Sequence, residues 1–322
     1  MKKLFYLMFA ALAFMACNNN EPSDNGKSGS GGSGSGGSGS GEGGGSSSSA
    51  VINPRSNNGA MPGLFTVDNG KQVHFSQGNL QYCASSRTWR FATNQWDTIG
   101  IYNEQIGKTE YTGWIDLFGW GTGNAPVTTD VNGDYSSFSE WGENPIANGG
   151  NAAGLWRTLS NTEWRHLFRS RSNAEELFGL GSVNGINGII ILPDDWRLPS
   201  GLTFNPSTKI KTQDQEQLGI LVWNENNEYY ENSLDKNYEH NIYSAAQWVL
   251  MEEAGAIFLP AGGKRIGTSA STVNSLGVYW ASAPVTWSGY EDYSFSMNFH
   301  DSGLFPHTYT DKYKGSSVRL VK

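Results

Sequence analysis

The chain has very little cysteine: two residues among 322, Cys17 and Cys83. A fold cross-linked by several disulfides is therefore excluded, and an apolar core must stabilise the domain. The five histidines show no His-x-x-x-His or Cys/His spacing, so no metal or cofactor is expected. Cys83 ends a strand-like run that starts at Asn79, and we expect it to be a small buried apolar residue.

Charge of positive sign is also scarce. Only 16% of the residues are charged, the net charge is −8, and Lys and Arg form no cluster beyond the first three residues. Binding to nucleic acid needs a basic footprint that neutralises phosphates, so nucleic acid is excluded as a partner. After residue 16 no apolar run approaches the length that spans a bilayer, so membrane association has to rest on a lipid.

The N-terminus has the order of a secretory signal. Two lysines precede an apolar stretch of twelve residues (4–15), which is too short to cross a membrane. Ala16 and Cys17 then end the stretch as a small residue followed by cysteine. This order resembles a bacterial lipoprotein signal, a family in which the cysteine is acylated and becomes the first mature residue. We therefore expect residues 1–16 to be a signal peptide and Cys17 to be lipidated.

A glycine-serine segment follows the cysteine. Residues 28–49 are glycine and serine except for Glu42, and such a segment is expected to stay flexible because it buries no apolar surface. Its root-mean-square span is about 25 Å. Residues 17–59 are thus interpreted as a lipidated cysteine and a flexible tether. Membrane anchoring is expected because lipoprotein maturation supplies the several acyl chains that stable anchoring needs. The expected location is the outer membrane and the cell surface, with the inner membrane as the open alternative.

Residues 60–322 are expected to form one elaborated domain of the α+β class. The chain contains 12 Trp, 14 Tyr, 15 Phe and 41 Gly, a composition that predicts short strands, many turns and a large aromatic core. Capping boxes that open at Ser160 and Ser244 predict two helices. The fold is therefore expected to combine two helices with antiparallel sheets and extensive irregular loops, above all over residues 92–154.

The expected strands follow from alternating or buried apolar runs. Two hairpins are predicted, the first over 63–67 and 72–76 and the second over 79–82 and 88–91. Further strands are predicted at 188–192, 256–259, 277–280, 293–299 and 317–321. The last of these is apolar enough to be paired inside a sheet, beside an N-terminal strand.

Several short motifs occur in a fixed order along this domain. They are Gly154-Leu-Trp-Arg-Thr-Leu159 with Glu163-Trp164, Leu192-Pro-Asp-Asp-Trp196, Phe258-Leu-Pro-Ala261, Tyr279-Trp-Ala-Ser282 and Ser317-Val-Arg-Leu-Val321. Together they resemble the Fibrobacter succinogenes major paralogous domain family of Bacteroidetes-type surface lipoproteins, over residues 63–322. The resemblance implies a C-type-lectin-like fold related to the sulfatase-modifying factors, and it implies no particular ligand.

The same fold carries the variable proteins of diversity-generating retroelements. Those proteins are often surface lipoproteins, and their hypervariable C-terminal region ends near a motif like Val318-Arg-Leu-Val321. This resemblance leaves open that the chain is itself such a diversified target.

An enzymatic alternative follows from the sulfatase-modifying branch of the fold. The formylglycine-generating relatives need a cysteine-based copper site, and lipidation of Cys17 leaves only Cys83 where a pair is required. The adjacent carboxylates Asp194 and Asp195 are the remaining candidates for acid-base work, against a simpler role in capping or loop hydrogen bonding. Glu252 and Glu253 are expected on the solvated face of the second helix.

Calcium is a further alternative. Asp130-Val-Asn-Gly-Asp134 has the oxygen-rich composition of a calcium loop, but it lacks the glycine spacing and the distal glutamate of an EF-hand. A turn rich in Asx hydrogen bonds is the favoured interpretation of this segment.

The segment from Trp287 to Tyr313 has the composition of a binding surface, because it combines rigid aromatic rings with adaptable polar side chains. Alternation over 293–299 predicts that the aromatic residues and Met297 face the core, and that the serines, Asn298 and His300 face solvent. The candidate ligand-binding residues are Trp287, Tyr290, Asp292, Ser294, Ser296, Asn298, His300, His307, Tyr309, Asp311 and Tyr313. A solvated strand face with aromatic turns is the competing interpretation.

The leading hypothesis is a lipid-anchored, surface-displayed binding protein without enzymatic activity. It holds a protein or glycan ligand through the segment 287–313, as an adhesin or receptor, and contacts the membrane through its lipid alone. The hypothesis rests on the tether and on the aromatic and polar C-terminal segment. The resemblance in fold supports it only by analogy, since one fold can carry many functions. The alternatives are an enzyme that uses Asp194 and Asp195 and a structural envelope or assembly protein.

Overall fold

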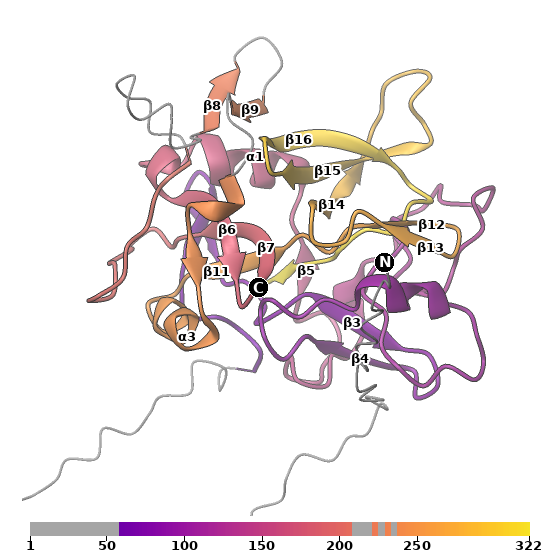
Figure 1. The fold of residues 1–322 in the computed structure, drawn as a ribbon. Helices are drawn as coiled ribbons and strands as arrows, with labels where there is room; N and C mark the ends of the chain where they lie inside the picture. The colour runs from indigo at the N-terminus through magenta and orange to yellow at the C-terminus, as the bar shows by residue number, and fades with distance from the viewer. Residues whose placement is uncertain (1–57, 208–220, 225–228, 233–236) are drawn as a thin grey trace, which may run out of the picture.

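The structure is a computed structural model that describes residues 58–207, 221–224, 229–232 and 237–322 (Figure 1). The predictions for the signal peptide, for Cys17 and for residues 18–57 of the tether lie outside the described residues. Within the described part the fold is mixed α+β, with few helices and mostly small antiparallel sheets.

Two hairpins open the described chain. Strands β1 (Phe65–Asp68) and β2 (Lys71–Val73) pair antiparallel, as do β3 (Leu80–Cys83) and β4 (Thr88–Phe91). Both pairs confirm the hairpins predicted from alternation. Cys83 is buried at the end of β3, as expected.

A four-stranded sheet has the order β10-β6-β7-β11. Its members are β6 (Phe178–Val183), β7 (Ile186–Ile191), β10 (Ile242–Tyr243) and β11 (Ile257–Pro260). The β6–β7 turn is Asn184-Gly185, and both residues have positive φ, as a tight hairpin with the twist of its strands requires. Strands β7 and β11 confirm two predicted strands, whereas β10 pairs with β6 in parallel and departs from the expected antiparallel plan.

A five-stranded sheet has the order β14-β15-β16-β9-β8. Its members are β8 (Leu221–Asn224), β9 (Tyr229–Asn232), β14 (Leu276–Pro284), β15 (Tyr293–His300) and β16 (Gly303–Asp311). Strands β14 and β15 confirm the predictions at 277–280 and 293–299. Figure 1 shows β15 and β16 as long neighbouring strands of this sheet.

The remaining elements are short. They are β5 (Arg157–Thr158), β12 (Lys264–Ile266), β13 (Ser269–Ser271), β17 (Leu320–Val321) and the 3-10 helices η2 (Gly100–Gln105), η3 (Trp141–Glu143), η4 (Ala174–Glu176) and η5 (Asn237–Glu239). Strand β17 pairs with β5, and Val321 also bridges to Phe75, so the last strand lies beside an N-terminal segment as expected. It is shorter than the predicted 317–321. Residues 92–154 are mostly irregular, as predicted.

Both predicted helices are present, and each begins at its predicted cap. In α1 (Asn161–Arg169) the Ser160 hydroxyl accepts from the Glu163 N–H while the Glu163 carboxylate accepts from the Ser160 N–H. Ser244 and Gln247 form the same reciprocal pair at α3 (Ala245–Glu253). Two otherwise unpaired backbone donors are satisfied at each start, so the local sequence fixes where these helices begin.

Three buried clusters make up the core, and the two larger sheets separate them. The first core lies between the sheets, because it takes Ile189 and Ile191 from β7 and Tyr279 from β14. The alternate residues Ile190 and Trp280 face outward into the third and second cores, respectively. Strands β7 and β14 are therefore covered on both faces.

The predicted solvent exposure of one charged residue, Glu252, was wrong. Glu252 is 1% exposed, although it was expected on the solvated face of α3; its neighbour Glu253 is exposed. The Glu252 carboxylate accepts hydrogen bonds from Trp248 Nε1 and Gln95 Nε2, both at 3.1 Å. Gln95 comes from a loop more than a hundred residues earlier, so no local pattern could predict this contact.

Candidate functional site

Six rings from the β14–β15 loop and from strands β15 and β16 form one cluster at an end of the five-stranded sheet. The members of this aromatic cluster are Trp287, Tyr290, Tyr293, Phe295, His307 and Tyr309. Tyr290 and Tyr309 lie 5.3 Å apart, centroid to centroid, at an interplanar angle of 80°. Trp287 meets Tyr309 at 6.1 Å and 85°. Such edge-to-face pairs suit the ring quadrupoles and fix the orientation of each ring.

The outer rings of the cluster face solvent. Trp287 is 51% exposed, Tyr290 37% and Tyr309 40%. The inner rings are anchored, because Phe295 belongs to the first core and Tyr293 packs against it. A hydrogen bond with Tyr290 raises the pKa of Tyr309, so this phenol stays protonated at neutral pH and keeps its hydroxyl proton. The cluster thus presents rigid apolar surface with polar edges to solvent, which is unusual unless something binds there.

Helix α1 supports the cluster from one side. Asn161 is its first residue, and its Nδ2 lies 3.1 Å from Nε2 of His307. The His307 ring packs against Phe295, with the ring centroids 4.8 Å apart and the planes tilted by 34°. The position of His307 therefore depends on where α1 begins.

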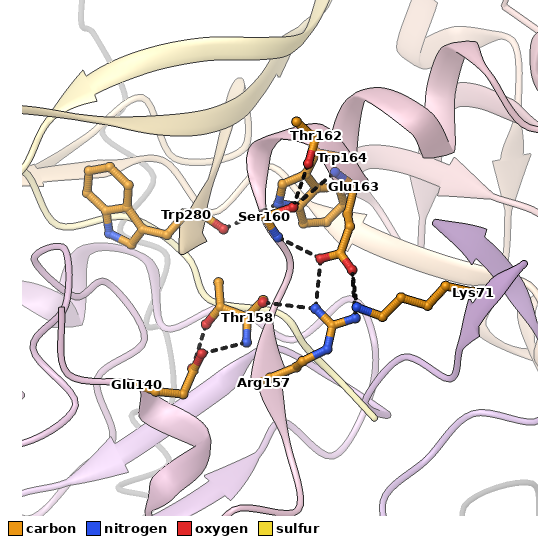
Figure 2. Close-up of polar contacts among 9 residues, drawn as sticks. All are labelled: Lys71, Glu140, Arg157, Thr158, Ser160, Thr162, Glu163, Trp164 and Trp280. Carbon is orange, nitrogen blue, oxygen red and sulfur yellow. Dashed lines mark hydrogen bonds and ion pairs between the residues drawn. The ribbon is translucent and has the colours of Figure 1, made fainter. Parts of the chain in front are cut away.

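A polar junction fixes that helix start (Figure 2). The Glu163 carboxylate accepts two hydrogen bonds from Arg157, at 2.7 and 2.8 Å, and one from Lys71 at 2.8 Å. Burial alone would raise the pKa of Glu163, but the hydrogen bonds from Arg157, Lys71 and the Ser160 N–H outweigh it and lower the pKa. The carboxylate is consequently ionised at neutral pH and ties β2, β5 and α1 together.

A groove of about 510 Å³ adjoins the aromatic cluster, and Tyr293 belongs to both. Three segments line the groove: residues 131–136, 291–293 and 311–313. It lies where β16 ends and β15 begins, since Tyr293 and Asp311 are paired across the two strands. Asp292, Asp311 and Tyr313, which the sequence nominated as ligand-binding residues, all line it.

The groove carries negative charge. Asp134, Glu291, Asp292 and Asp311 contribute four carboxylates, and Lys312 contributes the single ammonium group, so the formal charge is −3. Hydrogen bonds from Ser136 lower the pKa of Asp134, and one from the Gly289 N–H lowers that of Glu291. Both carboxylates are therefore ionised at neutral pH. Asp311 forms an ion pair with Lys314.

Lys312 faces away from the open part of the groove. The residue is 7% exposed, its Nζ donates to the Glu291 carbonyl at 2.6 Å, and it lies 4.9 Å from the Trp120 ring centroid. Burial lowers its pKa. The ammonium therefore holds the β14–β15 loop against the second core and is largely shielded from solvent.

Two nominated residues are buried, which corrects the prediction. Ser294 and Ser296 are 0% and 1% exposed, although alternation placed them on a solvated face. Ser296 is paired with Trp280 of β14, so its side chain shares the face that Trp280 directs into the second core. The hydroxyls are satisfied inside, because Ser294 donates to the Ala283 carbonyl and Ser296 bonds to Thr310. The serine side of the sheet is covered here, and the surface site lies on the aromatic side instead.

Asn298 and His300 are half-buried near the far end of β15. His300 is seven residues from Tyr293, a separation of about 23 Å along an extended strand. Its Nδ1 lies 3.1 Å from the Ser302 hydroxyl in the β15–β16 turn. These two residues are therefore not brought together with the aromatic cluster.

The carboxylates of the enzymatic alternative have structural partners. Asp194 Oδ2 accepts from the Thr66 N–H and hydroxyl, both at 2.7 Å, and from Gln72 Nε2 at 2.9 Å. Arg171, which is buried, pairs with its other oxygen at 3.4 Å. Asp194 thus ties the β1–β2 hairpin to the end of β7, and Asp195 beside it is exposed. This geometry gives Asp194 the simpler role in loop hydrogen bonding.

The segment nominated for calcium forms turns. Asp130 Oδ1 accepts from the Asn132 N–H and Asp134 Oδ1 from the Ser136 N–H, both at 2.9 Å, which is the Asx pattern expected from the sequence. Within the described ranges, no group of three or more His, Cys, Asp or Glu residues has the arrangement to hold a metal ion.

Sequence reasoning missed several contributors to the site, among them Glu291, Tyr135 and Lys312. All three line the groove, yet none was nominated. The Tyr135 hydroxyl donates to the Asp130 carbonyl at 2.9 Å and so shapes the loop that forms one wall. A tyrosine within an Asx-rich loop was the available signal, but nothing local linked that loop to residues 291–313.

Comparison of the chain with protein-family models, with curated proteins and with solved structures returns no match.

Proposed function

We propose that this chain is a lipid-anchored, surface-displayed protein that binds a protein or glycan ligand through the aromatic cluster and the adjoining groove. One observation carries the proposal: Trp287, Tyr290 and Tyr309 are exposed together, held edge to face, on a core-anchored base. Rigid Trp and Tyr rings contribute large contact areas on binding while losing little conformational entropy. Binding of this kind needs no catalytic group.

The proposed fold is C-type-lectin-like. The ordered motifs from Gly154 to Val321 motivate it, and the irregular stretch 92–154 together with two helices and antiparallel sheets is compatible with it. The same resemblance motivates the narrower proposal that the chain is a target of a diversity-generating retroelement. An imperfect genomic copy of the segment encoding residues 280–320, next to a reverse-transcriptase gene, would support that proposal.

The anchor is proposed from the sequence. Lipidation of Cys17 and a long glycine-serine tether would hold the domain at the outer membrane, on the cell surface, while leaving the aromatic cluster free to meet a partner. No helix among the described residues has the length and apolar character to cross a bilayer. Metabolic labelling with a fatty-acid analogue tests the anchor, and a Cys17→Ser chain that still incorporates the label would refute it.

Array binding tests the ligand site. The full-length protein in detergent is screened against glycan and protein arrays, beside the triple variant Trp287→Ala, Tyr290→Ala, Tyr309→Ala. Because each hot-spot ring is worth about 2 kcal/mol, the variant should bind its ligand at least about 30-fold more weakly. The matched control is Tyr102→Ala, a ring of η2 that is 52% exposed and lies outside the cluster.

The control separates a binding role from simple loss of surface area. Unchanged affinity of the triple variant for every captured ligand refutes the site. Self-association of the wild-type protein that the triple variant abolishes, without any captured ligand, would favour the assembly alternative.

A further inference from the structure

We infer that the ligand presents basic side chains, and that the groove receives an arginine- or lysine-containing segment of a polypeptide. The inference rests on the proposed function, because it names the chemistry that the same site recognises. It goes further by choosing between the two proposed ligand classes, protein and glycan.

Charge complementarity is the first argument. Four carboxylates from three separate segments line the groove, and one of them, Asp311, is paired with Lys314. The one ammonium group among the lining residues, that of Lys312, is turned toward Trp120. Asp134, Glu291 and Asp292 are exposed to solvent. The potential in the open part is therefore negative, and a cationic segment would be drawn to it and held by charge-assisted hydrogen bonds.

The aromatic lining is the second argument. Tyr293 and Tyr313, both half-buried, stand among the carboxylates in the groove, and the buried Tyr135 backs one of its walls. An ammonium or guanidinium group is attracted to the face of an aromatic ring and bonds to a carboxylate at the same time, whereas an acidic or hydroxylic ligand uses only part of this lining. Planar guanidinium fits both kinds of contact better than a point-like ammonium, so arginine should bind more tightly than lysine.

A neutral ligand fits the groove less well. Covering ionised carboxylates removes water from them, and hydroxyl donors return only part of that free energy. Asp134 and Glu291 both have pKa values held below their usual range, so neither escapes this cost by taking up a proton near neutral pH. A basic side chain replaces the lost hydration with an opposite charge.

The groove adjoins the aromatic cluster, so one peptide can contact both. Tyr293 belongs to the groove and lies 5.5 Å from Tyr290 and 5.4 Å from Tyr309 in the cluster. A segment whose basic side chain sits in the groove can therefore place a neighbouring apolar or aromatic side chain on Trp287. The recognised sequence would combine a basic residue with a large apolar one.

Peptides of defined charge test the inference. Anisotropy is measured with the full-length protein in detergent and labelled (Gly-Arg)4, (Gly-Lys)4, (Gly-Ser)4 and (Gly-Glu)4. We expect binding in the order Arg, then Lys, with the neutral and acidic peptides below both. Raising the salt from about 20 to about 300 mM should weaken (Gly-Arg)4 binding about tenfold, because partly exposed charges are screened.

Matched variants locate the effect. The double variant Glu291→Gln, Asp292→Asn should bind (Gly-Arg)4 at least about tenfold more weakly, since it removes two of the four lining carboxylates. The control Asp195→Asn, Glu253→Gln removes the same charge from exposed positions outside the groove and should leave binding unchanged. Equal binding by the two double variants overturns the inference, as does equal binding of (Gly-Ser)4 and (Gly-Arg)4 by the wild type.

The same measurements separate this inference from the proposed function. A neutral oligosaccharide that binds in a Trp287-dependent manner, while (Gly-Arg)4 shows no binding, refutes the cationic ligand and leaves the binding function standing. If no array ligand depends on Trp287 and no peptide depends on Glu291 and Asp292, both proposals fail.

Discussion

Replacement of Asp116 by asparagine should remove a pH dependence from the stability of the fold. Asp116 is 1% exposed, and its carboxylate accepts hydrogen bonds from the Ile99 N–H at 2.9 Å and from Asn103 Nδ2 at 2.8 Å. Burial raises its pKa to about 6, and the hydrogen bonds oppose this shift only in part. The folded protein therefore binds a proton at a pH where the unfolded chain has lost it.

The sign and size follow from that difference. The ordinary pKa of the group is 3.8, so between about 4 and 6 the folded state is protonated at Asp116 and the unfolded state is not. Stability falls as the pH rises through this window, because unfolding then releases the proton. A difference of about two pKa units corresponds to about 3 kcal/mol in the free energy of unfolding. The penalty is present in full above pH 6 and absent below pH 4.

Urea unfolding of the two proteins at pH 4, 5, 6 and 7 provides the measurement. Asparagine keeps the bond from Asn103 but turns an amide toward the Ile99 N–H, which costs about 1 kcal/mol at every pH. Relative to the wild type, the variant should gain about 3 kcal/mol between pH 4 and pH 7. If the difference in the free energy of unfolding between variant and wild type stays constant with pH within about 0.5 kcal/mol, burial does not disfavour this charge. The control is Asp195→Asn, at an exposed position.

Three further substitutions test the packing. Glu163→Gln should lower the free energy of unfolding by about 2 kcal/mol at pH 7, and by less as the pH falls below 4.5. The reason is that a carboxylate whose pKa is lowered by folding stabilises the fold only above the pKa of the unfolded chain. An equal loss at pH 3 and pH 7 in thermal melts would contradict the ion pairs. Gly142→Ala places a Cβ 1.7 Å from the Trp156 carbonyl oxygen, so unfolding in urea should reveal a loss above about 2 kcal/mol, and a neutral effect would refute this close approach. Glu252→Met should lower the free energy of unfolding by about 3 kcal/mol in the same assay, because it leaves buried donors without an acceptor. The control Glu253→Gln should change it by no more than about 0.5 kcal/mol. Similar values for the two variants would show that Glu252 is not buried.

Local signals predicted much of the fold. The capping boxes at Ser160 and Ser244 place the starts of both helices because each box satisfies backbone donors within four residues of sequence. The hairpins around Gly70 and Arg87 follow from alternation and turn chemistry in the same way. Information of this kind is complete within a short window, so it does not depend on where the rest of the chain lies.

Buried polar groups escaped prediction because their partners are distant in sequence. Arg319 is 1% exposed; its Nη2 donates to Gln95 Oε1 at 2.8 Å, and its charge lies near Glu252. Burial lowers the pKa of Arg319 to about 10, which still leaves it charged at neutral pH. A motif in the sequence marked Arg319 as part of the last strand, but only the folded chain gives it a hydrogen-bond partner in Gln95 and an opposite charge in Glu252.

The position of the candidate site escaped prediction for the same reason, because it depends on contacts between residues that are distant in sequence. Alternation along β15 correctly separates the aromatic residues from the serines, but it does not say which side meets solvent. Because the second core covers the serine side, Ser296 is packed against Trp280, and the aromatic side meets solvent where the first core ends. There Tyr293 and Phe295 continue the core outward into Trp287 and Tyr309. Any ligand of this end of the sheet therefore meets rings braced by the protein interior, which is why substitutions at Trp287 should weaken binding without unfolding the domain.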